Sequence, residues 1–147
     1  MILLDRNKKA LMPINSGVFE VSQFKSQKKL NNENVGSLIL YPSGEVKRIS
    51  KVSILGFYGD TIWQKIFSIL NTTNRIEIHL DEQNIDLSTF KTEIIEYLRN
   101  DCCSADPLLP QSRGLEAAID DIIAAVTFQD LYHSLEVPAE EDCLDVL

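Results

Sequence analysis

The chain has 147 residues, of which 44% are hydrophobic and 24% are charged, the length and composition of one globular domain. A domain of this length buries enough surface to fold without a metal or a disulfide framework. Its formal net charge of −8 disfavours nucleic acid and anionic membrane surfaces as partners. We therefore expect residues 1–147 to form a single domain that binds neither.

The chain also lacks the sequence signals of export and of membrane insertion. No apolar run approaches the roughly 20 residues that cross a bilayer. At the N-terminus the basic cluster follows the short apolar start, whereas a secretory signal has the reverse order. Cys102, Cys103 and Cys143 are odd in number and two of them are adjacent, which fits a reducing compartment better than a disulfide framework. These features predict a cytoplasmic protein.

The N-terminal third of the chain predicts coil followed by β-structure. Residues 16–24 are rich in Val and Phe, which favours a strand. Residues 25–34 are polar, with clustered Asn, which is typical of a loop. Residues 36–57 then have an apolar run on each side of Pro-Ser-Gly at 42–44, where Pro presets φ and Gly accepts a positive φ. We predict a β-hairpin there, with a bulge near residues 49–52, where the alternation breaks.

A first helix is predicted over residues 59–73, with Asp60 or Thr61 as its cap. Its apolar face is broad, and a face of this width is usually well buried. Trp63 and Phe67 are four residues apart on this face. We expect both aromatic side chains to lie in the core rather than to form a ligand platform.

A half-exposed strand and a second helix follow. Residues 74–81 alternate strictly between apolar and polar residues, which predicts a strand with His79 on its polar side. Residues 86–101 predict a helix that begins at Asp86 or Ser88. The core stripe predicted for this helix consists of Phe90, Ile94, Tyr97 and Leu98.

The last third predicts a connector, a third helix and a tail. Residues 102–114 contain prolines and a glycine, which is typical of a connector. The third helix is predicted to start near residues 112–114, with room to continue through residues 128–135 before Pro138 stops it. Its apolar stripe consists of Leu115, Ile119, Ile122, Ile123 and Val126. Residues 136–147 form an acidic tail that we expect to be loose or ordered by a partner.

The order of these elements is β-β-β, then α-β-α, then α. A mostly antiparallel sheet, made of the hairpin and about two further strands, satisfies this order when about three α-helices pack on one of its faces. The predicted class is therefore α+β.

The chain shows no signature of a catalytic or metal site. No G-x-S-x-G elbow, P-loop or G-x-G-x-x-G is present. Cys102 or Cys103 with a histidine could form a cysteine-hydrolase pair, but nothing local activates the thiol. Asp130 and His133 could share one helical face as metal ligands, but two ligands do not make a site. We predict no cofactor, no metal and no catalysis.

Charge is divided unevenly along the chain. Residues 1–60 carry nine Lys and Arg against five Asp and Glu, a net charge of +4, and residues 61–147 carry five against 17, a net charge of −12. The acids of the third helix and the tail can form one continuous negative surface, consisting of Glu116, Asp120, Asp121, Asp130, Glu136, Glu140, Glu141, Asp142 and Asp145. Such a surface steers a basic partner and fixes its orientation. The alternative is an acidic face that serves solubility.

In its overall character the chain resembles bacterial immunity proteins from toxin–immunity pairs, such as those of contact-dependent growth inhibition. The shared features are small size, acidity, an α+β pattern, few motifs and the one-sided carboxylate surface. No defining signature is matched, so no functional residue is carried over. The resemblance implies a stoichiometric complex with one cognate toxin domain, often a basic nuclease, whose active site is blocked without chemistry. The free protein would be a monomer or a weak dimer.

Three other classes of protein remain open. Type III secretion chaperones are also small, acidic and α+β, and they dimerise, but they usually begin with a helix, whereas this chain begins with coil and strand. Another binding adaptor would share the same charge pattern. A small hydrolase would need a cleft with convergent polar groups, which the sequence neither shows nor excludes.

Overall fold

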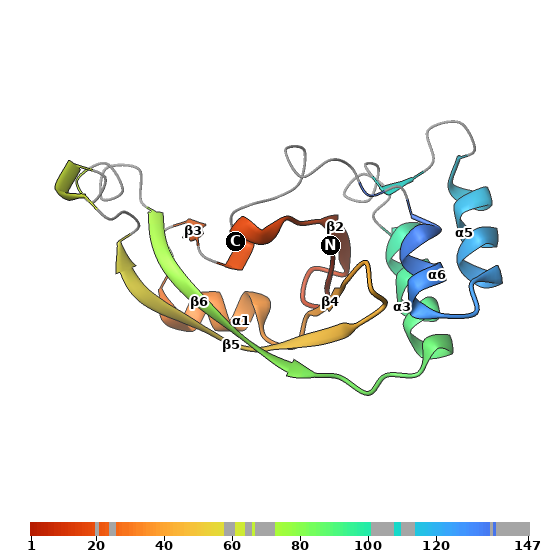
Figure 1. The fold of residues 1–147 in the computed structure, drawn as a ribbon, viewed down its shortest axis with the longest axis horizontal. Coiled ribbons are helices and arrows are strands. Elements are labelled where there is room, and N and C mark those ends of the chain that lie inside the picture. The colour runs from red at the N-terminus through yellow and green to blue at the C-terminus, as the bar shows by residue number, and fades with distance from the viewer. Residues whose placement is uncertain are drawn as a thin grey trace.

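Among the described residues, a six-stranded antiparallel sheet has the order β2-β1-β4-β5-β6-β3 (Figure 1). The computed structural model describes residues 1–19, 21–23, 26–57, 61–63, 66, 73–100, 108–109, 114–135 and 137. The strands are β1 (Ile2–Asp5), β2 (Ala10–Pro13), β3 (Val21–Gln23), β4 (Leu38–Leu40), β5 (Val46–Phe57) and β6 (Thr73–Glu82). The helices are α1 (Gln27–Asn34), α3 (Leu87–Asn100), α5 (Gly114–Ala124) and α6 (Phe128–His133), with a 3-10 turn η1 (Ser16–Phe19). The predicted α+β class is confirmed.

Helices cover both faces of the sheet. Ile2 and Leu4 of β1 belong to a core shared with α3, α5 and α6, whereas Leu3 belongs to a second core with Leu30 of α1. Alternate residues of a strand point to opposite faces, so the two cores lie on opposite sides. We expected helices on one face only, and this was wrong. Figure 1 shows α3, α5 and α6 gathered at one end of the sheet and α1 along the long β5–β6 ribbon.

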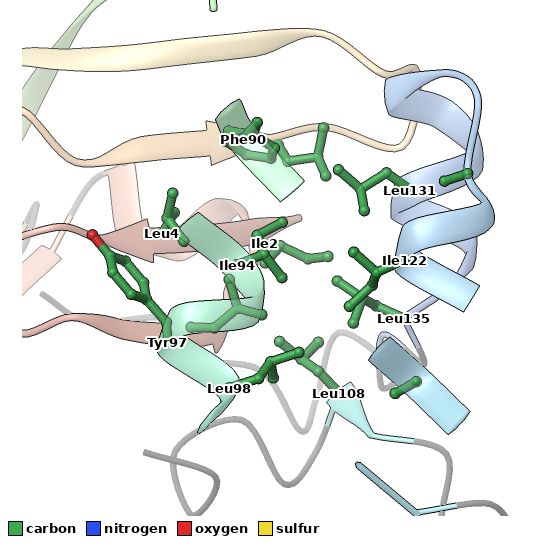
Figure 2. Packing of buried hydrophobic residues seen from close by; sticks show 14 of the residues in the cluster. Ile2, Leu4, Phe90, Ile94, Tyr97, Leu98, Leu108, Ile122, Leu131 and Leu135 are labelled. Atoms are coloured by element: carbon green, nitrogen blue, oxygen red, sulfur yellow. The ribbon is translucent and has the colours of Figure 1, made fainter. Parts of the chain in front are cut away.

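The larger core confirms the apolar stripe predicted for α3. Phe90, Ile94, Tyr97 and Leu98 are all buried. Figure 2 shows Ile94 pointing into the same core as Ile2 of β1. The ring of Phe90 also meets that of Phe128 from α6 edge-on, with 5.4 Å between centroids. The α3 helix therefore joins the sheet to the C-terminal helices.

The predicted coil at the N-terminus is a β-hairpin, β1–β2. Both strands have four residues, and all of β1 is buried. A strand that is buried on both faces lacks apolar–polar alternation, which is why the pattern gave no strand signal. In the turn, Asp5 Oδ1 accepts from the backbone N–H groups of Asn7 and Lys8, both at 3.0 Å. Arg6 binds both carboxylate oxygens of Glu93 on α3, at 2.8 and 3.0 Å, and so ties the turn to that helix.

Two predictions about residues 16–34 were wrong. Residues 16–24 were predicted to be a strand, but η1 occupies Ser16–Phe19, and among the described residues of this segment the strand β3 is limited to Val21–Gln23. Residues 25–34 were predicted to be a loop, but they contain α1, whose N-cap Ser26 accepts from the Lys29 N–H at 3.3 Å. Leu30 is the buried apolar residue of this helix. One buried apolar residue cannot form the periodic apolar stripe from which a helix is predicted.

The polar side chains of α1 protect an open edge of β5. The three-residue β4 pairs with β5 only as far as Arg48, whereas β5 has 12 residues. Beyond that point Val52 N–H donates to Asn31 Oδ1 and Ile54 N–H donates to Gln27 Oε1, both at 2.9 Å. The Gln27 amide also donates to the Val52 carbonyl. Two amide side chains one helical turn apart thus take the place of a neighbouring strand.

The β-hairpin predicted over residues 36–57 is confirmed as β4 and β5. Gly44 N–H donates to the Tyr41 carbonyl at 2.9 Å and closes the turn. Its φ of +85° lies in the region that favours glycine. A Cβ at Gly44 would lie 2.9 Å from the backbone nitrogen of Gln129, so the turn rests directly against α6.

The predicted bulge in β5 is also confirmed. The register with β6 shifts between Ile49 and Lys51, which leaves Ser50 as the extra residue. This insertion brings Ile49 and Val52 into the same core, although three positions separate them. The inserted residue changes the face to which the following side chains point. The alternation of apolar and polar residues in the sequence is therefore interrupted here, while the apolar residues stay on one face.

The strand predicted over residues 74–81 is confirmed as β6. Ile76 is buried, whereas Arg75, Glu77 and His79 are exposed, as the alternation predicted. The first helix predicted over residues 59–73 lies mostly outside the described residues. Ile62 and Trp63, which are described, are 72% and 69% exposed, so the expectation that Trp63 lies in the core was wrong.

The predicted third helix is two helices, α5 and α6. Thr127 Oγ1 accepts from Asp130 N–H at 3.0 Å and Asp130 Oδ2 accepts from Thr127 N–H at 2.9 Å, a reciprocal cap that starts α6. Lys91 of α3 donates to the Ile123 carbonyl at 2.8 Å and to the Ala125 carbonyl, and so closes α5. The chain therefore turns between the two helices instead of continuing.

Candidate protein-binding surface

The outer face of α5 presents the first of the predicted partner-binding acids. Glu116 and Asp120 are both exposed and lie one helical turn apart. Asp121 is half-buried on the flank of the helix, where it has a partner. The opposite face is buried against α3 and the sheet through Ala118 and Ile122. The α5 helix is thus anchored on one side and carries carboxylates on the other.

Asp130, another predicted partner-binding residue, caps a helix in this structure. Besides the Thr127 N–H, its Oδ2 accepts from the Val126 N–H at 3.3 Å. Hydrogen bonds from Thr127 and Val126, together with the charge of His133, lower the pKa of the Asp130 carboxyl. The side chain is exposed and ionised at neutral pH. It therefore adds negative charge next to α5 as well as starting α6.

The chain offers these carboxylates few basic neighbours. No Lys or Arg follows Arg113 in the sequence. Lys91 reaches the end of α5 from α3, but its ammonium group is bonded to carbonyl oxygens. The negative charge of α5 therefore faces outward without a cation on its own helix, which is the condition for long-range attraction of a basic partner.

Apart from Val137, the acidic tail of residues 136–147 lies outside the described residues. Five of the predicted partner-binding residues belong to it, namely Glu136, Glu140, Glu141, Asp142 and Asp145. The continuous surface that would join them to α5 stays a prediction. Cys102, Cys103 and Cys143 also lie outside the described residues.

Three polar side chains, Ser53, His79 and Glu77, lie close together on the β5–β6 ribbon. The sequence did not predict this group, because the distance between these side chains depends on the register of the two strands. His79 Nε2 lies 3.2 Å from Ser53 Oγ and 3.4 Å from Glu77 Oε2. In a catalytic triad the hydroxyl and the carboxylate contact different ring nitrogens. Here both face the same nitrogen, and His79 and Glu77 are exposed. This geometry fits a surface network and does not supply a nucleophile with an oriented base.

The geometry also gives little basis for a metal centre. Among the described residues, no three His, Cys, Asp or Glu side chains gather closely enough to hold a metal ion. The helical pair Asp130 and His133 is described, but the Asp130 carboxylate accepts two backbone hydrogen bonds.

Comparison with known proteins assigns the chain to no group. It matches no family model, no curated protein and no solved structure. The described part of the chain contains no helix long and apolar enough to cross a membrane. Its function has to be inferred from its own residues.

Proposed function

We propose that this protein is a non-catalytic binding protein of the immunity kind, which holds and neutralises one basic toxin domain. The outer face of α5 and the acidic residues 136–147 form the proposed contact surface. The observation that carries this proposal is the exposed pair Glu116 and Asp120, one helical turn apart, in a stretch without Lys or Arg.

Electrostatics explains why such a surface suits an inhibitor. A net charge of −12 over residues 61–147 attracts a basic domain at long range and accelerates its capture. Carboxylates on a packed helix can also occupy a groove that normally holds nucleic-acid phosphates. An immunity protein of this kind would act in the cytoplasm, where an incoming nuclease finds its substrate.

An acidic chaperone or adaptor is the second candidate. Exposed Ile62 and Trp63 favour it, because exposed apolar patches often hold segments of other proteins. Type III secretion chaperones are one class of this kind. A chaperone of that class would be a stable homodimer by mass, whereas the immunity proposal expects a monomer or a weak dimer that forms a one-to-one complex.

Charge reversal tests the immunity proposal. The tagged chain is purified from its native host, the co-purifying partner is identified and produced alone, and affinities are measured by titration at several salt concentrations. We expect Glu116→Lys with Asp120→Lys to weaken binding on the order of 100-fold and to flatten its salt dependence. Circular dichroism should be unchanged, because both side chains are exposed.

The matched control is Glu77→Lys with Glu82→Lys. Both residues are exposed on β6, and the pair makes the same change in net charge. We expect the control to retain most of the affinity. Equal losses in the two double variants would mean that net charge, and not the α5 face, governs binding. Unchanged binding by the α5 variant would refute the proposed surface.

A further inference from the structure

Two large apolar side chains are exposed where α5 turns into α6. Ile123 is 60% exposed and Val126 is 79% exposed, although both belong to the apolar stripe predicted for the third helix. The α5 helix ends at Ala124, so the chain leaves the helical path before Val126. We call residues 123–127 the α5–α6 corner.

Carboxylates flank this apolar pair on both sides. Asp120 precedes Ile123 by three residues and therefore lies on the same helical face. Asp130 Oδ2 accepts from the Val126 N–H at 3.3 Å, so its carboxylate lies directly beside that residue. The corner thus combines two exposed apolar side chains with two nearby carboxylates, and the Lys91 ammonium beside it is already bonded to the Ile123 and Ala125 carbonyls. This is the complement of an apolar side chain flanked by Lys or Arg.

The corner is also held rigidly. The Thr127–Asp130 cap fixes the chain on one side, and the Lys91 ammonium fixes the Ile123 and Ala125 carbonyls on the other. Little ordering entropy is lost when a partner binds a surface that is already fixed.

We infer that the α5–α6 corner is the anchor point for the basic partner, and that it receives an apolar side chain flanked by Lys or Arg. This inference rests on the proposed function and adds the chemistry that its contact surface recognises. Ile123 and Val126 contribute affinity by excluding water, whereas Glu116 and Asp120 contribute attraction at long range.

Two synthetic peptides of equal positive charge test the anchor. One carries leucine on a single helical face among lysines, and the other carries serine at the leucine positions. Each is titrated into the isotope-labelled full chain, and amide shifts and affinities are measured by NMR. We expect the leucine peptide to bind about tenfold more tightly than the serine peptide. Its shifts should centre on Ile123, Val126 and Thr127.

Alanine variants separate the anchor from the charges. Ile123→Ala with Val126→Ala should remove the tenfold advantage of leucine and leave the affinity of the serine peptide unchanged. Leu55→Ala is the matched control, because Leu55 is an exposed apolar residue on β5. That variant should keep the full leucine advantage.

Different results would refute the anchor at the α5–α6 corner and the acidic face of α5. If leucine confers no advantage, or the alanine pair retains it, the anchor is refuted while the acidic face stands. If Glu116→Lys with Asp120→Lys leaves both peptides bound as before, the acidic face itself is refuted. Shifts centred on Trp63, or corner shifts that grow on concentrating the free chain, would assign the apolar contact to another surface or to a second copy, and would overturn the anchor.

Discussion

Because Gly44 has no side chain, the β4–β5 turn can pack directly against helix α6. Its φ of +85° closes the β4–β5 hairpin, and its Cα faces the backbone of Gln129 in α6. An L side chain would be strained in this backbone conformation and would also collide with α6. The residue therefore specifies both the turn and the distance between the hairpin and the C-terminal helices.

We expect Gly44→Ala to lower the free energy of unfolding by about 2–4 kcal/mol, the sum of a conformational penalty and an overpacking penalty. Urea denaturation measures this loss. Gly36→Ala is the control, because Gly36 has a φ of +93° but a Cβ added there would meet no atom within 4 Å. That variant should lose only about 1 kcal/mol, from the backbone conformation alone. Equal losses would show that the Gln129 contact yields without cost.

At the scale of elements, α1 shows why composition alone can mislead. Gln27 and Asn31 are polar because their side-chain amides bond the backbone of β5, and not because the segment is a loop. The long elements α3 and β6 were predictable, since each has one buried and one exposed face with a clear period. The doubly buried β1 and the amide-bearing α1 lack such a period.

Asn31→Ala tests the edge-capping role of α1. We expect it to lower the free energy of unfolding by about 1–2 kcal/mol, because the Val52 N–H loses its acceptor. The Val52 amide should also exchange with solvent faster, as measured by hydrogen–deuterium exchange. Asn32→Ala is the matched control on the exposed side of the same helix and should be nearly neutral. Similar effects in both variants would point to helix propensity as the cause.

At the scale of the whole molecule, the response to acid depends on carboxylates that cap helices. Hydrogen bonds from Ser88 and Thr89 hold the pKa of Asp86 well below its ordinary value of 3.8, and the pKa of Asp130 is also lowered. A folded-state pKa below the unfolded value adds stability above the unfolded pKa, and this stability is lost as the pH falls through the folded pKa. The protein should therefore lose stability below about pH 4.

The measurement is the urea midpoint as a function of pH in the wild type and in Asp86→Asn. Asparagine keeps a side-chain acceptor at the N-cap but has no titrating charge. We expect the variant to be less stable at neutral pH and to show a shallower decline in acid. A decline as steep as that of the wild type would mean that other carboxylates control the acid response.

The candidate surface was only partly predictable from the sequence. Exposure of Glu116 and Asp120 followed from helical spacing alone. The exposure of the apolar residues at the α5–α6 corner could not be predicted, because the helical period of apolar residues in the sequence continues beyond the end of α5. The pattern Thr127-x-x-Asp130 is the local signal for that stop, since a hydroxyl residue three positions before a carboxylate can form a reciprocal cap.

The position of β3 has a consequence for the order of folding. This strand precedes α1 in the sequence but pairs with β6, where Val21 lies opposite Arg75. The hairpins β1–β2 and β4–β5 can close over short loops, whereas β3 must wait until the distant β6 is in place. During synthesis the N-terminal strands would therefore emerge before their sheet can be completed. The outer edge at β3 would be the last to join, and its long loop closure would slow the final step of folding.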